Sequence, residues 1–82
     1  MIALLTLYSK PGCHLCEELR TLLDELQPEY GFVLEEIDIK RDPTLFARYR
    51  HDIPVLLMGG HEIARGRVIA RDLVSLLQRG SF

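Results

Sequence analysis

Both cysteines of the chain, Cys13 and Cys16, lie three residues apart at the point where an apolar run stops and a helical pattern begins. The run from Ile2 to Tyr8 has the composition of a strand, and the Pro11-Gly12 pair after it favours a turn. A strand, a tight turn and a helix that opens on two thiols are typical of an α/β domain. We expect the rest of the chain to be the scaffold that presents these thiols.

The predicted position of the two thiols favours redox chemistry. The thiolate is the reactive form, and a free thiol with a pKa of about 8.5 is mostly protonated at neutral pH. Unpaired amides and the helix dipole stabilise an anion at a helix N-terminus, so Cys13 is expected to be the attacking sulfur. Lys10 and a protonated His14 would add to this positive field. Cys16, one turn further along, is expected to be the shielded, resolving thiol.

A metal site is the main alternative use of two nearby cysteines. A structural zinc ion needs four ligands. No second cysteine pair follows, and His14, His51 and His61 show no ligand spacing, so no metal ligands are predicted within one chain. A non-enzymatic alternative remains, in which two chains bridge an iron–sulfur cluster or a metal through Cys13. A Cys-x-x-Cys pair after a strand in an α/β pattern more often indicates a redox motif.

Length and charge exclude several classes of function. The 82 residues predict a single domain over residues 1–82, and the net charge of −2 with interspersed charges argues against nucleic-acid binding. The five arginines between Arg48 and Arg71 are expected to be solvated surface. No apolar run approaches the roughly 20 residues that span a bilayer, and the first residues do not resemble a signal peptide. We therefore expect a cytoplasmic protein, in which cysteine pairs tend to be catalytic or redox-sensing.

The spacing of apolar residues predicts the element order β-α-β-α-β-β-α. Strands are expected over residues 3–8, 32–39, 53–58 and 61–65, and helices over 14–27, 43–50 and 70–79. Pro28 is expected to end the first helix, Asp42-Pro43 to start the second and Gly80 to stop the third. Gly59-Gly60 between two apolar runs predicts a hairpin. Glu35 interrupts the apolar face of its strand, and the sequence offers no reason for it.

This order, with Cys-x-x-Cys after the first strand and Ile53-Pro54 at the third, resembles the glutaredoxin branch of the thioredoxin superfamily along nearly the whole chain. The chain is most similar to the small glutaredoxin-like proteins, since it lacks the extra N-terminal elements of full thioredoxins and their tryptophan before the active site. The resemblance implies a four-stranded mixed sheet of order 2-1-3-4 with helices on both faces. It also implies a cis peptide bond between Ile53 and Pro54 that faces Cys13.

The same resemblance implies a thiol–disulfide oxidoreductase that acts in electron transport and cell redox homeostasis. Cys13 and Cys16 would be its redox pair, and Lys10, His14, Ile53 and Pro54 its substrate-binding residues. The backbone before the proline would pair with a bound peptide or glutathione by strand addition. The expected substrates are protein disulfides and glutathionylated thiols. A reductase or glutathione, as co-substrate, would be the electron donor. No bound cofactor is expected, and the protein is expected to be a monomer.

Two departures from the glutaredoxin pattern bear on this function. His14-Leu15 stands between the cysteines in place of the usual Pro-Tyr, and a charged His14 would favour the thiolate and a more oxidising pair. Ala64-Arg65-Gly66-Arg67 stands in place of Gly-Gly-x-Asp, whose acid holds the ammonium of glutathione. A cation at that position weakens classical glutathione recognition. Arg65 and Arg67 are expected to be surface residues, with pairing to a carboxylate of another partner as the alternative.

Overall fold

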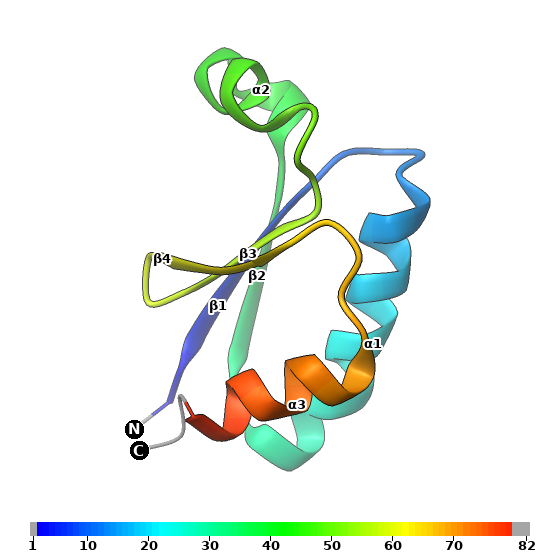
Figure 1. Cartoon of the computed structure of the whole chain (residues 1–82). Coiled ribbons are helices and arrows are strands. Elements are labelled where there is room, and N and C mark those ends of the chain that lie inside the picture. The colour runs from blue at the N-terminus through cyan, green and yellow to red at the C-terminus, as the bar shows by residue number, and fades with distance from the viewer. Residues whose placement is uncertain (1, 80–82) are drawn as a thin grey trace.

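Four strands form one mixed sheet in the order β2-β1-β3-β4 (Figure 1). The central strand β1 (Leu4–Ser9) is parallel to β2 (Val33–Asp38) and antiparallel to β3 (Val55–Met58), which is antiparallel to β4 (His61–Arg65). The predicted strand order 2-1-3-4 is confirmed. The computed structural model describes residues 2–79, so the expected helix stop at Gly80 lies outside the described residues.

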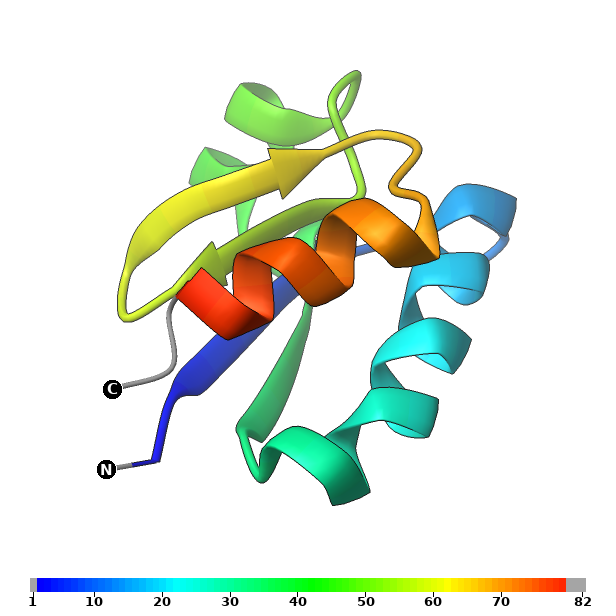
Figure 2. The same cartoon turned by 60° about the horizontal axis from the view of Figure 1, so that its bottom comes forward.

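Helices cover both faces of the sheet, as predicted. Figures 1 and 2 show α1 (His14–Tyr30) and α3 (Ala70–Arg79) on one face and α2 (Pro43–Tyr49) on the other. Successive side chains of a strand point to opposite faces. Leu7 of β1 accordingly packs in the core between the sheet and α1 and α3, whereas Tyr8 packs against α2.

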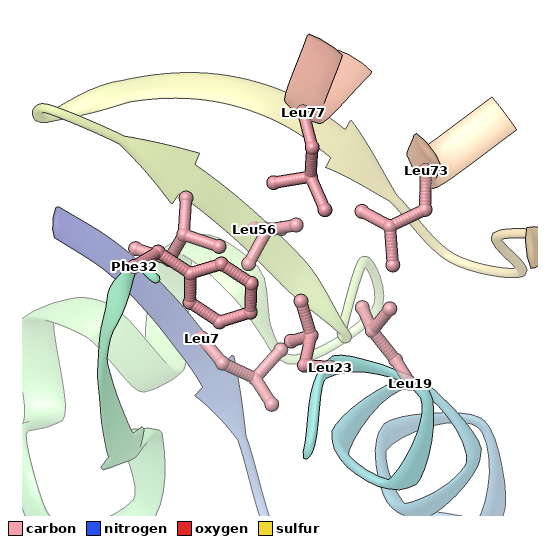
Figure 3. Packing of buried hydrophobic residues seen from close by; sticks show 8 residues of the cluster. Leu7, Leu19, Leu23, Phe32, Leu56, Leu73 and Leu77 are labelled. Carbon is pink, nitrogen blue, oxygen red and sulfur yellow. The ribbon is translucent and has the colours of Figure 1, made fainter. Parts of the chain in front are cut away.

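The larger core lies between the sheet, α1 and α3 (Figure 3). The spacing of leucines in the first helix predicts an apolar stripe on one side, and Leu19 and Leu23 are buried in this core while Leu22 and Leu26 pack against it. Its buried members come from β1, α1, β3 and α3 and from the residue before β2: Leu5, Leu7, Leu19, Leu23, Phe32, Leu56, Leu73 and Leu77. This core joins the first strand, β1, and the last helix, α3, to the helix that begins beside Cys13.

A smaller core lies under α2 and supports the start of β3. Ile39, Tyr49 and Val55 are buried there, and the rings of Tyr8 and Tyr49 lie 5.1 Å apart between centroids. Ile53 packs against the same cluster. The segment that leads into β3 is thus anchored by α2, which explains why so short a helix belongs to the fold.

The first helix does not end at Pro28 as predicted but continues to Tyr30. Proline lacks one backbone donor, and in the last turn this removes a single hydrogen bond. The helix ends at Gly31, whose positive φ of 68° is the left-handed conformation of a helix C-cap and whose N–H donates to the carbonyl of Gln27 at 2.8 Å. The glycine, not the proline, is the true stop signal.

The second strand is shorter than predicted and lies at the edge of the sheet. It ends at Asp38, whose side chain accepts a hydrogen bond from the N–H of Lys40 and opens a 3₁₀ turn, η1 (Ile39–Arg41). Glu35 lies on the face that α2 covers only in part, where Val33 is 50% exposed. A charged residue is therefore compatible with this position, which removes the puzzle that Glu35 posed in the sequence.

The predicted hairpin between β3 and β4 is confirmed. Gly59 and Gly60 both have positive φ, 57° and 85°, as a two-residue turn between twisted strands requires. Leu57 faces Glu62 across the hairpin, but Leu56 faces Ala64, so one extra residue of β4 forms a β-bulge at this point. No helix within residues 2–79 is both long and apolar enough to cross a membrane.

Candidate active site

Cys13 occupies the N-cap position of α1. Its backbone is extended, with φ −92° and ψ 105°, and its carbonyl accepts the hydrogen bond of the Glu17 N–H at 3.0 Å. Its Sγ accepts a hydrogen bond from the N–H of Cys16 at 3.2 Å. The sulfur thus takes the place of the side-chain oxygen that usually caps a helix, within the field of the first-turn amides.

Cys13 and Cys16 form a disulfide, with their Cα atoms 5.2 Å apart. Cys16 is 2% exposed and packs inside the fold, whereas Cys13 is half-buried. The prediction that Cys16 is the shielded thiol is confirmed. The sulfur of Cys13 is accessible to a substrate, and that of Cys16 is buried next to it. A two-step thiol exchange needs this arrangement.

The loop before Cys13 places two of the predicted site residues. The N–H of Cys13 donates to the carbonyl of Lys10 at 3.4 Å, and Gly12, with φ 80°, makes the turn between them. The Lys10 side chain is half-buried beside this loop, and His14 is exposed as the first residue of α1. Their proposed effect on the thiolate stays a prediction.

Ile53 and Pro54 lie at the same end of the sheet as the redox loop. Tyr8, close to the end of β1, pairs with Val55 at the start of β3, so the residues before Val55 run beside the segment that leads to Cys13 (Figure 1). The Ile53–Pro54 peptide bond is cis. Pro54 is fully buried and supports the site from inside, whereas Ile53 is half-buried and retains accessible surface.

The backbone of Ile53 has no hydrogen-bond partner among residues 2–79, for either its N–H or its carbonyl. On either side of it, the N–H of Asp52 donates to the carbonyl of Tyr49 and the carbonyl of Pro54 accepts from the N–H of Gly66, each at 2.8 Å. The two neighbours are held and Ile53 between them is left free to pair. This pattern suits the docking of an extended peptide.

A polar network that the sequence did not reveal lies under the redox loop. Ser9, at the end of β1 and only 5% exposed, donates to Glu36 of β2 at 2.7 Å, and Arg20 of α1 donates to the same carboxylate. The hydrogen bond from Arg20 to Asp24 and then that to Glu36 raise the pKa of the guanidinium. The network ties α1 to both parallel strands just below Cys13. Its one sequence signal is Glu36, a charged residue at a position that faces α1.

Arg65 is occupied by two carboxylates of the chain itself. It forms a two-point ion pair with Glu62 and a further contact of 3.3 Å between Nη1 and Oδ2 of Asp52. The hydrogen bond from Arg65 lowers the pKa of Glu62, and the same bond raises that of Arg65. Arg65 is exposed, as predicted for a surface residue, and its guanidinium already pairs with carboxylates of the chain itself rather than with that of another partner. Arg67 is exposed.

A hollow of about 710 Å³ opens on the β2 side of the redox loop. It is lined by the loop, the first turn of α1, the end of β2 and the turn before α2: Ser9, Lys10, Pro11, Gly12, Glu17, Glu36, Ile37, Asp38, Arg41 and Asp42. Cys13 is not part of its lining. The accessible sulfur thus lies at the surface beside this hollow rather than inside it.

No three His, Cys, Asp or Glu side chains gather to form a metal site within the described chain, residues 2–79. The alternative of a cluster that bridges two chains draws its ligands from two copies of Cys13. A single chain does not test it, and it stays a prediction.

This fold, with a disulfide-forming Cys-x-x-Cys pair at the N-terminus of the first helix, defines a thiol oxidoreductase of the thioredoxin superfamily. The chain belongs to the glutaredoxin-like domain family (DUF836), whose sequence model matches residues 4–78. The suggested membership of the small glutaredoxin-like proteins is thereby confirmed.

Solved structures agree with this assignment. A protein from X. campestris is 28% identical and superposes with a TM-score of 0.78, covering 92% of this chain and 96% of its own. Protein Ne2328 from Nitrosomonas europaea is 29% identical with a TM-score of 0.78, covering 93% and 92%. A thioredoxin from Halobacterium salinarum shares the fold at 18% identity, with a TM-score of 0.76 over 98% of this chain and 75% of its own.

Proposed function

We propose that the chain reduces disulfides of proteins, or mixed disulfides of glutathione, through the Cys13–Cys16 pair. The observation that carries this proposal is the position of the Cys13 Sγ, which accepts a hydrogen bond from the N–H of Cys16 and is joined to the sulfur of the buried Cys16. A location in the cytoplasm, where thiols are kept reduced, and a monomeric state are parts of the same proposal.

The reaction proceeds by two thiol exchanges. The Cys13 thiolate attacks one sulfur of the substrate disulfide, which forms a mixed disulfide and releases the other substrate sulfur as a thiolate that takes up a proton. Cys16, after losing its proton, attacks the Sγ of Cys13 and releases the second substrate thiolate. The substrate gains two electrons and two protons, and the chain is left with the Cys13–Cys16 disulfide. Two glutathione molecules or a reductase then return it to the dithiol.

The free backbone groups of Ile53 support an extended substrate. A peptide laid beside this residue would form hydrogen bonds with its N–H and carbonyl, as an added strand does. Lys10 lies in the loop before Cys13 and His14 directly follows it, and the proposal takes both as substrate-binding residues. The proposal needs no bound cofactor, because both electrons pass through the sulfur atoms.

Equilibration in glutathione buffers tests the electron donor. We expect a reduction potential of about −200 to −230 mV, in the range of glutaredoxins, because the amides of α1 stabilise the thiolate of the reduced form. Mass spectrometry of the same samples should show glutathione on Cys13. A potential near the thioredoxin value of about −270 mV, without an adduct, would contradict glutathione as the electron donor and would assign re-reduction to another donor.

Cys16→Ser should trap the reaction at its first step. The variant keeps the attacking thiol but has no resolving thiol. With a disulfide-bonded peptide as substrate, the mixed disulfide between the peptide and Cys13 therefore accumulates. We expect mass spectrometry to detect one adduct per chain, on Cys13, and turnover of protein disulfides to fall by at least about tenfold. Wild-type protein under the same conditions is the control and should show no lasting adduct. Full turnover by the variant would show that Cys16 does not resolve the intermediate.

A further inference from the structure

Arg65, at the end of β4, holds two carboxylates with all three of its guanidinium nitrogens. Its Nε and Nη2 atoms each lie 2.6 Å from an oxygen of Glu62, and its Nη1 atom lies 3.3 Å from Oδ2 of Asp52. A two-point pair with a carboxylate fixes the plane of the guanidinium, which a lysine would not achieve. The direction in which Nη1 points is therefore set by Glu62.

The β-bulge in β4 makes this arrangement possible. In a regular strand, Glu62 and Arg65 would project from opposite faces, because they are three residues apart. The extra residue turns both toward one face, since Glu62 lies opposite Leu57 and Arg65 opposite Val55, and both of these partners pack against the α2 cluster. Arg65 thereby reaches Asp52, in the middle of the segment that connects α2 to β3.

We propose that Arg65 is a positioning residue for substrate docking. Asp52 directly precedes Ile53, and Gly66, the residue after Arg65, donates its N–H to the carbonyl of Pro54 at 2.8 Å. The end of β4 thus contacts the chain on both sides of Ile53, through Arg65 at Asp52 and through Gly66 at Pro54. Ile53 between them is the residue whose backbone is left unpaired. The kinetic part of this inference rests on the function proposed above.

The expected effect is on binding and not on the reaction of the sulfur. Ion pairs as exposed as these contribute little to global stability, so their loss leaves the fold intact. Loss of the contact with Asp52 lets the segment before Pro54 adopt more conformations. Ordering this segment then lowers the binding free energy that is available when a peptide docks. The cap at Cys13 involves α1 and the redox loop, with no contact from Arg65.

The test compares Arg65→Gln and Arg65→Lys with Arg71→Gln, which removes one exposed positive charge from α3. We expect Arg65→Gln to raise KM for a mixed-disulfide peptide about threefold to fivefold, the most that ion pairs as exposed as these support, while kcat changes less than about 1.5-fold. Arg65→Lys should show the same rise, because it keeps the charge but lacks the fork. Arg71→Gln should match the wild type. Wild-type KM in Arg65→Gln, or its recovery in Arg65→Lys, would overturn the positioning role.

Amide hydrogen exchange tests the same inference without relying on turnover. In Arg65→Gln, exchange at the Gly66 amide should become about threefold to fivefold faster, while the Cys16 amide in α1 stays unchanged. If the wild type reduced no disulfide, the proposed function would fail, and this measurement would still decide the role of Arg65. Unchanged exchange at Gly66 would show that Arg65 does not hold the segment.

Discussion

Cys13→Ser should abolish disulfide reduction, with a loss of at least about a thousandfold. Serine replaces the accessible cysteine sulfur by a hydroxyl that does not form a disulfide bond. It is also a good N-cap residue, so its oxygen can still accept the hydrogen bond from the N–H of Cys16. The substitution therefore removes the nucleophile and leaves the start of α1 in place.

The measurement is the rate of reduction of a protein disulfide at saturating electron donor. Its control is the thermal unfolding midpoint of the variant beside that of the reduced wild type, which should agree because neither contains a disulfide. Equal rates for variant and wild type would overturn the proposed function, since no other cysteine than Cys16 remains in the chain.

Leu23→Ala should destabilise the fold strongly, with a loss of about 3 to 5 kcal/mol in the free energy of unfolding. Leu23 is fully buried at the centre of the larger core, where α1 meets the sheet and α3 (Figure 3). A chain of 82 residues has a total stability of about 4 to 12 kcal/mol, so this loss is a large fraction of the whole.

Urea unfolding of reduced protein measures this loss as a lower midpoint at unchanged slope. Leu4→Ala is the matched control, because it removes the same side chain from a position that is 47% exposed. Leu4 is the first residue of β1. Its loss should stay below about 1.5 kcal/mol. Equal losses in the two variants would mean that the core shown here does not carry the stability of the fold.

The main elements and the redox pair were predictable because their signals are local. The leucine stripe of α1, the Asp42-Pro43 helix start and the Gly59-Gly60 turn each depend on a few neighbouring residues, and all appear in the structure. The strand order followed from the resemblance to glutaredoxins. The error at Pro28 has a different origin, since the last turn of a helix tolerates a proline when a glycine cap follows.

What the sequence did not reveal depends on contacts between distant segments. The pairing of Ser9 with Glu36 joins residues 27 positions apart across two strands. The ion pair between Arg65 and Asp52 requires the β-bulge in β4. The amino-acid composition of β4 does not reveal this one-residue change of register. The sequence therefore predicts no more than a surface position for Arg65. The residue is exposed, as predicted, and in addition links two segments beside the site.

The edge position of β2 also bears on how the protein behaves at high concentration. An unpaired strand edge offers a row of backbone donors and acceptors on which further chains can add and aggregate. Glu35 lies in the middle of this edge strand, on the face that α2 covers only in part. A second copy that paired there in register would bring two Glu35 carboxylates together, which disfavours the growth of a continuous sheet. The carboxylate that interrupts the apolar face of β2 thus protects the chain from its own edge.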